Sequence, residues 1–493
     1  MAMIEVEQLV IVTATLAFPP LFLLVALTLV LATFGKSLGI RRRYVQLLVD
    51  VFKWGSRLHK EATSEANLLD DESDSSESEP EESAAEYAPS RLTVDGQGDG
   101  RKSRTASGSN LIEREASEHI LAILQEGEKL DPEERVFGLV KDSLDFVKAG
   151  VESIIQDNVT NRFSAEELAS WNMLTRTAGG HTFVSFRLTA VWLLGFLFRY
   201  FVLFPTRLII LTVGMTFLVV TTAVVGYFPE GERKKQLNRL VSLMAYRILC
   251  RSVSAIISYH NAENQARPGG ICVANHTSPI DVCVLSHDNC YALVGQKHGG
   301  VFGIVQRALN RASSHIWFER SVSGDRAAVA QRLRDHVADP SKLPILIFPE
   351  GTCINNTSVM QFKKGSFECA DTIFPVAIKY DPRFGDPFWN SAKQSALEYL
   401  VMMMTSWAIV ADVWYLPPMK RLENEDAIAF ANRVKAEIAK AGGLVDLEWD
   451  GQLKRYPVSS KMIDKQRELY SKRIEDSMSN LLESKPSANL KEE

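Results

Sequence analysis

The stretch that decides the fold is VANHTSPID, from Val273 to Asp281. The apolar run Ile271–Ala274, which overlaps its start, favours a buried strand, and Pro279 is suited to the first position of a helix. His276 is therefore expected on the loop at the carboxyl end of a strand, with Asp281 on the first turn of the next helix. This order predicts a strand, a loop and a helix that bring an imidazole and a carboxylate together.

A carboxylate on one ring nitrogen of His276 fixes the tautomer and leaves the other nitrogen free to take a proton from a hydroxyl. Such a pair is a candidate general base, and Asp281 is the candidate carboxylate. The alternative is a loop histidine whose only partner is a helix-capping aspartate.

The segment around this stretch has the pattern of an α/β domain, with a central mixed sheet flanked by helices. A helix is predicted at 325–337. Trp407–Leu416 is too short to span a membrane, and its β-branched and aromatic residues favour a core strand. The other strands are predicted at 271–274, 291–294, 315–318, 343–348 and 373–378.

Three further motifs follow the first in a fixed order. They are IWFER at 316–320, FPEGT at 348–352 and FPVA at 374–377. With the H-x4-D spacing of His276 and Asp281, this order resembles the four motifs of the glycerolipid acyltransferases. From about Asn161 to Tyr470, the chain is similar to the endoplasmic-reticulum glycerol-3-phosphate acyltransferases of types three and four.

The resemblance implies a role for each motif. His276 would be the base and Asp281 the residue that orients it. Arg320 would bind the phosphate of glycerol 3-phosphate through its two-pronged guanidinium, unless it only pairs with a neighbouring acid.

The later motifs have roles on the two substrates. Glu350 and Gly351 would lie against the acceptor, where a glycine lets the backbone approach a ligand closely, and the alternative is a turn with an exposed acid. Pro375 would shape the acyl-CoA side, although a proline at a strand edge fits the sequence equally well. Acyl-CoA is expected as a co-substrate, and no cofactor or metal is expected. The thiolate of coenzyme A is a good leaving group, so no covalent intermediate on the enzyme is needed.

Two apolar regions predict membrane attachment. Leu9–Phe34 is long enough to span, and the basic residues after it place the following chain in the cytosol. Its Pro19-Pro20 pair leaves a re-entrant hairpin open. In 188–228, two helices with a turn at Pro205 are expected, and Arg199 and Arg207 should face a headgroup or the protein because a charge is costly at full depth. We therefore expect a multi-pass protein of the endoplasmic reticulum membrane with a cytosolic catalytic domain.

These patterns predict a domain order. Val45–Leu58 is expected to lie on the membrane surface as a basic amphipathic helix, and Ser164 to Glu167 to cap a helix that runs through Leu174. The predicted regions are a membrane segment with that basic helix (1–60), an acidic disordered linker (61–110), a helical region (111–187), a membrane helix hairpin (188–228), the catalytic domain (229–456), and a terminal helix with a polar tail (457–493).

Composition limits the function. A net charge of -5 with no basic-aromatic array argues against a nucleic-acid partner. The six cysteines include no C-x-x-C pair, which favours free thiols over zinc or disulfides.

The expected activity is 1-O-acylation of sn-glycerol 3-phosphate by acyl-CoA at a lipid membrane, which yields lysophosphatidic acid and begins glycerolipid and triacylglycerol synthesis. The alternatives are acylation of lysophosphatidic acid itself, or a lipid-binding protein without catalysis, and protein partners are not predicted.

Overall fold

The computed structural model describes residues 25–36, 39–74, 161–166, 171–175, 186–319 and 325–454, and the single residues 23, 168 and 468. Helix α2 (Ile40–Asp74) up to Thr63 and every element from η1 (Asn161–Phe163) to η5 (Gly451–Lys454) belong to one compact unit. The predicted terminal helix and polar tail (457–493) lie outside the described residues except for Glu468.

A sheet with the strand order β1-β8-β7-β2-β5-β3-β4 forms the centre of this unit, and β9 pairs with β7. Strand β2 pairs in parallel with β5 and β7, and β3 pairs in parallel with β4 and β5. Strands β7 and β8 are antiparallel. Their bounds are β1 Ile256–His260, β2 Ile271–Ala274, β3 Ala292–Gln296, β4 Ile316–Phe318, β5 Ile345–Ile347, β7 Thr372–Tyr380, β8 Val410–Tyr415 and β9 Met419–Lys420. A short parallel pair, β6 (Ser358–Val359) and β10 (Val445–Asp446), lies beside it.

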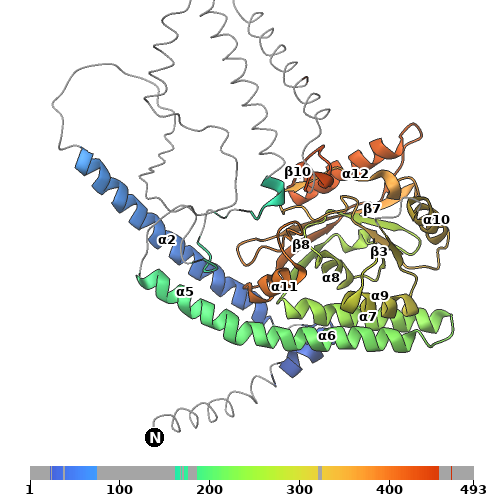
Figure 1. Ribbon diagram of the computed structural model, residues 1–493, viewed down its shortest axis with the longest axis horizontal. Coiled ribbons are helices and arrows are strands. Elements are labelled where there is room, and N and C mark those ends of the chain that lie inside the picture. Colours follow the sequence, from blue (N-terminus) through green and yellow to red (C-terminus); the bar gives the residue numbers. More distant parts are fainter. Residues whose placement is uncertain are drawn as a thin grey trace, which may run out of the picture. The chain divides into compact units, whose positions relative to one another are not determined.

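Helices cover both faces of the sheet (Figure 1). On one face Cys272 and Ala274 of β2 share a core with α7 (Glu232–Ser252), α8 (Asp281–Ser286), α9 (Gly300–Ala312) and α11 (Ala396–Thr405). On the other face Ile271 and Val273 share a core with α10 (Asp325–Val337) and α12 (Ala427–Gly442). Side chains of a strand alternate between its two faces, so a fully apolar strand such as β2 is buried on both sides. The predicted α/β class with a central mixed sheet is confirmed.

The predicted strands lie where they were expected. Strand β2 and helix α10 have the predicted bounds, and β8 lies within the predicted core strand 407–416. The other strands differ from the prediction by at most two residues at each end, as is usual at element boundaries.

The prediction of a membrane hairpin is wrong, because α5 (Phe186–Phe198), the π-helical η2 (Arg199–Leu203) and α6 (Phe204–Val225) form one continuous helix. Pro205 stands at the start of α6, directly after the π-helical turn. A wide turn of this kind accommodates a proline, which lacks an N–H and crowds the preceding turn. No other helix among the described residues is long and apolar enough to cross a membrane.

One side of this helix faces the protein. Arg207, Ile210, Gly214, Leu218, Thr222 and Val225 are buried and recur every three or four residues. Arg199 donates to the carbonyl of Thr405, and Arg207 donates to those of Met404, Ser406 and Trp407. Both arginines therefore face the protein, which is one of the two predicted surroundings.

The amino-terminal region differs from the prediction in two places. Leu48 and Phe52 of α2 pack with Trp171 instead of being free for a membrane surface. Helix α2 also runs to Asp74, past the start of the predicted acidic linker, because alanine, leucine and glutamate favour a helix. The rest of that linker lies outside the described residues, and the boundaries of the six predicted regions stay predictions.

The predicted capped helix from Ser164 to Leu174 is also wrong, since the described residues 164–166, 168 and 171–174 are not helical. Side chains of the catalytic unit hold the backbone of this segment instead. Asn355 donates to the carbonyls of Asn161 and Ser164, and Asn390 donates to that of Phe163. These tertiary contacts outweigh the local capping preference.

Candidate active site

The loop between β2 and α8 holds His276 and Asp281 together. Nδ1 of His276 lies 2.9 Å from Oδ2 of Asp281, and the aspartate is fully buried while the histidine side chain is 18% exposed. The hydrogen bond assigns the ring proton to Nδ1 and leaves Nε2 as the acceptor. The geometry that the H-x4-D spacing predicts is present.

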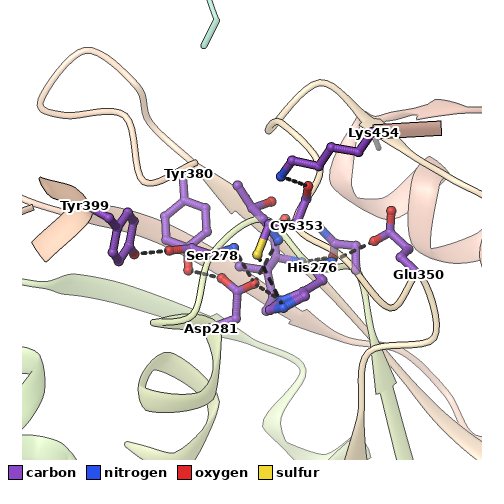
Figure 2. A network of polar contacts seen from close by, with 11 residues as sticks. His276, Ser278, Asp281, Glu350, Cys353, Tyr380, Tyr399 and Lys454 are labelled. Carbon is purple, nitrogen blue, oxygen red and sulfur yellow. Dashed lines mark hydrogen bonds and ion pairs between the residues drawn. The ribbon is translucent and has the colours of Figure 1, made fainter. Parts of the chain in front are cut away.

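Asp281 is held from four directions. Its Oδ2 also accepts from the backbone N–H groups of Thr277 at 2.8 Å and Ser278 at 2.9 Å. Its Oδ1 accepts from the hydroxyl of Tyr380, at the end of β7, and Ser278 in turn contacts the hydroxyl of Tyr399 (Figure 2). A buried carboxylate with four donors is held in one position, which suits a group that orients a base.

The surroundings of His276 stabilise the imidazolium that forms when the ring takes up a proton. Burial lowers the pKa of the ring, but Cys353 and the carboxylate of Asp281 raise it by more, so the pKa lies above its ordinary value. The ring of Phe348 stacks on the imidazole with centroids 4.3 Å apart. An imidazolium gains from an aromatic face, so proton uptake from a substrate is favoured.

The charge of Asp281 can be tested separately from its hydrogen bonds. We expect Asp281→Asn to lower acyl transfer by about 10²-fold, because an amide oxygen can replace Oδ2 while the negative charge beside the imidazolium is lost. Activity should be measured beside Asp412→Asn, which alters the exposed His260–Asp412 pair at 2.9 Å. Equal activity of the two variants would contradict a catalytic role for the charge.

Glu350 follows β5 and holds the same loop by its backbone. Its Oε1 accepts from the N–H of His276 at 2.7 Å, and its Oε2 accepts from the N–H of Met360 at 2.9 Å. The residue is 1% exposed, so it is not the exposed turn acid of the alternative interpretation. These contacts make Glu350 a positioning residue for the base, while contact with the acceptor stays a prediction.

Burial raises the pKa of Glu350 to about 8, although the two backbone N–H donors lower it. Because this pKa lies above that of an unfolded glutamate, the folded protein binds the extra proton, and stability falls as the pH rises from about 4.3 to 8. We expect Glu350→Gln to flatten this decline, which is at most about 1.4 kcal/mol per pH unit. Thermal unfolding of both proteins in detergent across pH 5–8 measures the slope, and parallel curves would contradict the shifted pKa.

Gly351 and Pro375 occupy constrained backbone positions. Gly351 has a φ of +69°, which favours glycine, and a Cβ there would lie 3.2 Å from Nζ of Lys363. Pro375 pairs with Val273 in an inner strand, so the interpretation as an edge proline is wrong. The proline is tolerated because it lies between the part of β7 that pairs with β9 and the part that pairs with β8. Their roles toward substrates stay predictions.

Arg320 lies outside the described residues, and the preceding Glu319 is 3.4 Å from Lys297. Lys297 also lines a cavity of about 320 Å³. Its lining includes the cations Lys297, Arg307 and Arg332 together with His298, Gln306 and Trp317. No local pattern marks these three cations, and Lys297 directly follows β3 but lies three residues beyond the end of the predicted strand 291–294.

Parallel strands bring the motifs to one edge of the sheet. The carboxyl ends of β2, β3, β4 and β5 lie at the same edge, and one residue lies within three positions after each of them: His276, Lys297, Glu319 and Glu350. In open α/β sheets this edge is the usual place for ligands. Within the described part of the chain, no three His, Cys, Asp or Glu side chains form a group that could hold a metal ion.

The comparisons with known proteins define the class. The family model described as Acyltransferase matches residues 256–379, from β1 to β7, which include the His276 loop. A solved structure, the 1-acyl-sn-glycerophosphate acyltransferase PlsC of Thermotoga maritima, is similar at 17% identity with a TM-score of 0.35 and covers 51% of this chain and 95% of that one. Such a low score carries no conclusion by itself.

Curated relatives cover nearly the whole chain. The chain is 48% identical to "Glycerol-3-phosphate acyltransferase 3" of Danio rerio, over 90% of this chain and 91% of the relative. It is 49% identical to "Glycerol-3-phosphate acyltransferase 4" of Homo sapiens, over 92% of each. The chain therefore belongs to the family of the glycerol-3-phosphate acyltransferases 3 and 4, which confirms the resemblance found in the sequence.

Proposed function

We propose that this protein transfers an acyl group from acyl-CoA to the sn-1 hydroxyl of glycerol 3-phosphate and so forms lysophosphatidic acid. One observation carries the proposal: the buried Asp281 orients His276 at the carboxyl edge of the sheet, in a chain whose relatives are named for this reaction. The chemistry needs a base for the hydroxyl and a site for the acceptor phosphate.

His276 supplies the base in this proposal. Its Nε2 takes the proton of the attacking hydroxyl while Asp281 holds Nδ1–H and stabilises the imidazolium that forms. The proton then passes to the departing thiolate of coenzyme A. No cofactor is required by these steps.

The phosphate of the acceptor is proposed to bind at the cationic side of the same edge. Arg320 is the proposed ligand. The cavity lined by Lys297, Arg307 and Arg332 supports a dianion site at this edge, because its lining has three cations. Glu350 and Gly351 would shape the acceptor side and Pro375 the acyl-CoA side.

We further propose that the protein acts at the cytosolic face of the endoplasmic reticulum membrane. The helix from Phe186 to Val225 supports attachment to lipid, because its buried side faces the catalytic unit while the side chains of Leu194, Phe201 and Val220 are 67%, 71% and 53% exposed. The described part of the first apolar run packs on α6 and α7 through Val25 and Ala32, which contact Ile210 and Ile248.

A parallel assay of two acceptors tests the function. Purified protein is given labelled palmitoyl-CoA with either glycerol 3-phosphate or 1-acyl-glycerol 3-phosphate. Preferential acylation of glycerol 3-phosphate is expected. Preference for the lysophospholipid would assign the protein to the next acylation, and no turnover of either by folded, membrane-bound protein would favour a non-catalytic lipid-binding role.

A further inference from the structure

A tyrosine from a distant strand holds the second carboxylate oxygen of Asp281. The first, Oδ2, is shared by three donors, which are Nδ1–H of His276 and the N–H groups of Thr277 and Ser278. Within the described part of the chain, Oδ1 accepts only from the hydroxyl of Tyr380 (Figure 2). The donors to Oδ2 all belong to the loop that carries the base, so Tyr380 supplies the contact that ties the carboxylate to the sheet.

The end of strand β7 is fixed where Tyr380 lies. The side chain of Asn356 forms two hydrogen bonds with the backbone of Tyr380, since its Oδ1 accepts from the N–H at 2.8 Å and its Nδ2 donates to the carbonyl at 2.8 Å. Asn275, the residue before His276, binds the backbone of Ile378 in the same way, at 2.8 and 2.9 Å. The two amides therefore hold the backbone of β7 at a fixed place relative to the loop of the base.

Water has no access to replace the phenol of Tyr380. Asp281 has no exposed surface and Tyr380 is 2% exposed. Burial, and after it the carboxylate of Asp281, raises the pKa of the Tyr380 hydroxyl well above its ordinary value, so the hydroxyl keeps its proton and is the donor. A carboxylate oxygen that is buried without a donor keeps its full desolvation cost, so this contact holds the carboxylate in one orientation.

We propose that Tyr380 is a positioning residue for the acyl transfer, because its hydroxyl fixes the carboxylate of Asp281 and limits the negative charge that this group presents to His276. The inference deepens the proposed function and rests on it. Tyr380 touches no substrate in this proposal and acts through Asp281.

The second part of the role follows from how a carboxylate shares its charge. Each donor to Asp281 withdraws part of the negative charge that would otherwise stabilise the imidazolium of His276. With the phenol of Tyr380 in place, the pKa of His276 is therefore lower than three donors alone would leave it. A lower pKa favours release of the proton to the departing thiolate of coenzyme A, which the proposed reaction requires after the proton has been taken up.

Other titratable groups face the same pair from neighbouring elements. They are Glu350 and Cys353 after β5, Tyr399 of α11, Cys283 of α8 and Cys250 of α7. Burial raises the pKa of the Tyr399 hydroxyl and of the Cys250 and Cys283 thiols, so these groups stay neutral. Among the described residues, none of the five donates to a carboxylate oxygen of Asp281. A change in the pH profile on removal of the Tyr380 hydroxyl is therefore assigned to its contact with Asp281.

Replacing Tyr380 by phenylalanine removes the hydroxyl and keeps the ring. We expect Tyr380→Phe to lower kcat for palmitoyl transfer to glycerol 3-phosphate by about 10- to 100-fold, with KM changed by less than about twofold, because only the base is displaced. The acidic limb of the pH–rate profile should move to higher pH by about half a unit, because His276 then faces more negative charge.

A second buried tyrosine supplies the matched control. Tyr415 has no exposed surface, lies on the neighbouring strand β8, and places its hydroxyl 3.3 Å from Oδ2 of Asp288. Tyr415→Phe thus removes the same kind of contact from a different carboxylate. Its kcat should stay within about twofold of that of the unaltered protein, and its acidic limb should not move.

A difluorotyrosine at position 380 of the full-length protein separates charge from structure. Fluorine keeps the shape of the phenol nearly unchanged but makes it a stronger donor, so the acidic limb should move to lower pH, opposite to Tyr380→Phe. If Tyr380→Phe does not fold, the direction of this shift still decides the test. Shifts in the same direction in the two proteins altered at position 380, no shift on fluorination, or coinciding profiles of Tyr380→Phe and Tyr415→Phe would overturn the inference.

The unaltered protein tests the proposed function separately. If it acylated only 1-acyl-glycerol 3-phosphate, the proposed acceptor would be wrong, and the same variants would decide the role of Tyr380 on that substrate. Absence of turnover on both acceptors would overturn the proposed function and this inference together.

Discussion

Replacing His276 by alanine is expected to lower the acylation of glycerol 3-phosphate by about 10²- to 10⁴-fold. The variant removes the group that accepts the substrate proton, and no other described side chain contacts Asp281 in the same way. The protein should still fold, because the loop is also held by the backbone bonds of His276, whose N–H donates to Glu350 and whose carbonyl accepts from Ile354.

A second histidine–aspartate pair supplies the control. His260 and Asp412 are 2.9 Å apart on β1 and β8, and both side chains are more than 40% exposed. His260→Ala therefore removes the same kind of contact away from the motif residues, and its activity should stay within about twofold. The transfer of labelled palmitoyl groups by the two variants, measured at equal amounts of membrane-bound protein, tests whether His276 is the base. Retention of a tenth or more of the activity by His276→Ala would assign the base elsewhere.

Replacing Arg207 by leucine is expected to destabilise the protein by on the order of 3 kcal/mol. The guanidinium is 2% exposed and donates to the carbonyls of Met404, Ser406 and Trp407 at 2.8, 2.5 and 2.7 Å. It also donates to Oγ of Ser254. Leucine would leave these acceptors buried and unpaired, and an unpaired buried acceptor keeps its full desolvation cost.

Thermal unfolding in detergent measures this loss. The stability of Arg207→Lys should lie between that of the unaltered protein and that of Arg207→Leu, because a lysine keeps the charge but cannot reach several acceptors with one planar fork. Arg233→Leu, on the exposed start of α7, is the matched control and should change stability by less than about 0.5 kcal/mol. If Arg207→Leu were as stable as this control, the arginine would not anchor the apolar helix to the catalytic unit.

Local sequence predicted elements best where their pattern was independent of distant contacts. Strand β2 is apolar on both faces and α10 has a clear helical pattern, and both have the predicted bounds. The capping pattern at Ser164 and the turn at Pro205 failed for a shared reason. At Ser164 the local pattern favours a helix, but the segment is not helical and Asn355 holds its backbone. At Pro205 the local pattern favours a turn, but the helix continues and Arg207 holds it against the catalytic unit.

The candidate site divides in the same manner. His276 and Asp281 are five positions apart, so their contact follows from a strand, a short loop and the first turn of a helix. Tyr380 lies about a hundred residues further on and still contacts the same carboxylate, and Cys353 reaches the same imidazole from the loop after β5. No local pattern marks these two residues, because the parallel pairing of β5 and β7 with β2 brings them to the site.

The sequence by itself therefore determined the family, the α/β class and the pairing of His276 with Asp281, since each depends on the order and spacing of neighbouring residues. Only the tertiary structure decided that the apolar region is one helix along the catalytic unit, that Glu350 holds the backbone of the base, and that Cys353 adjoins it. The physical reason is that hydrophobic periodicity and spacing act over a few residues, whereas burial and hydrogen-bond partners depend on which distant strands the sheet places side by side.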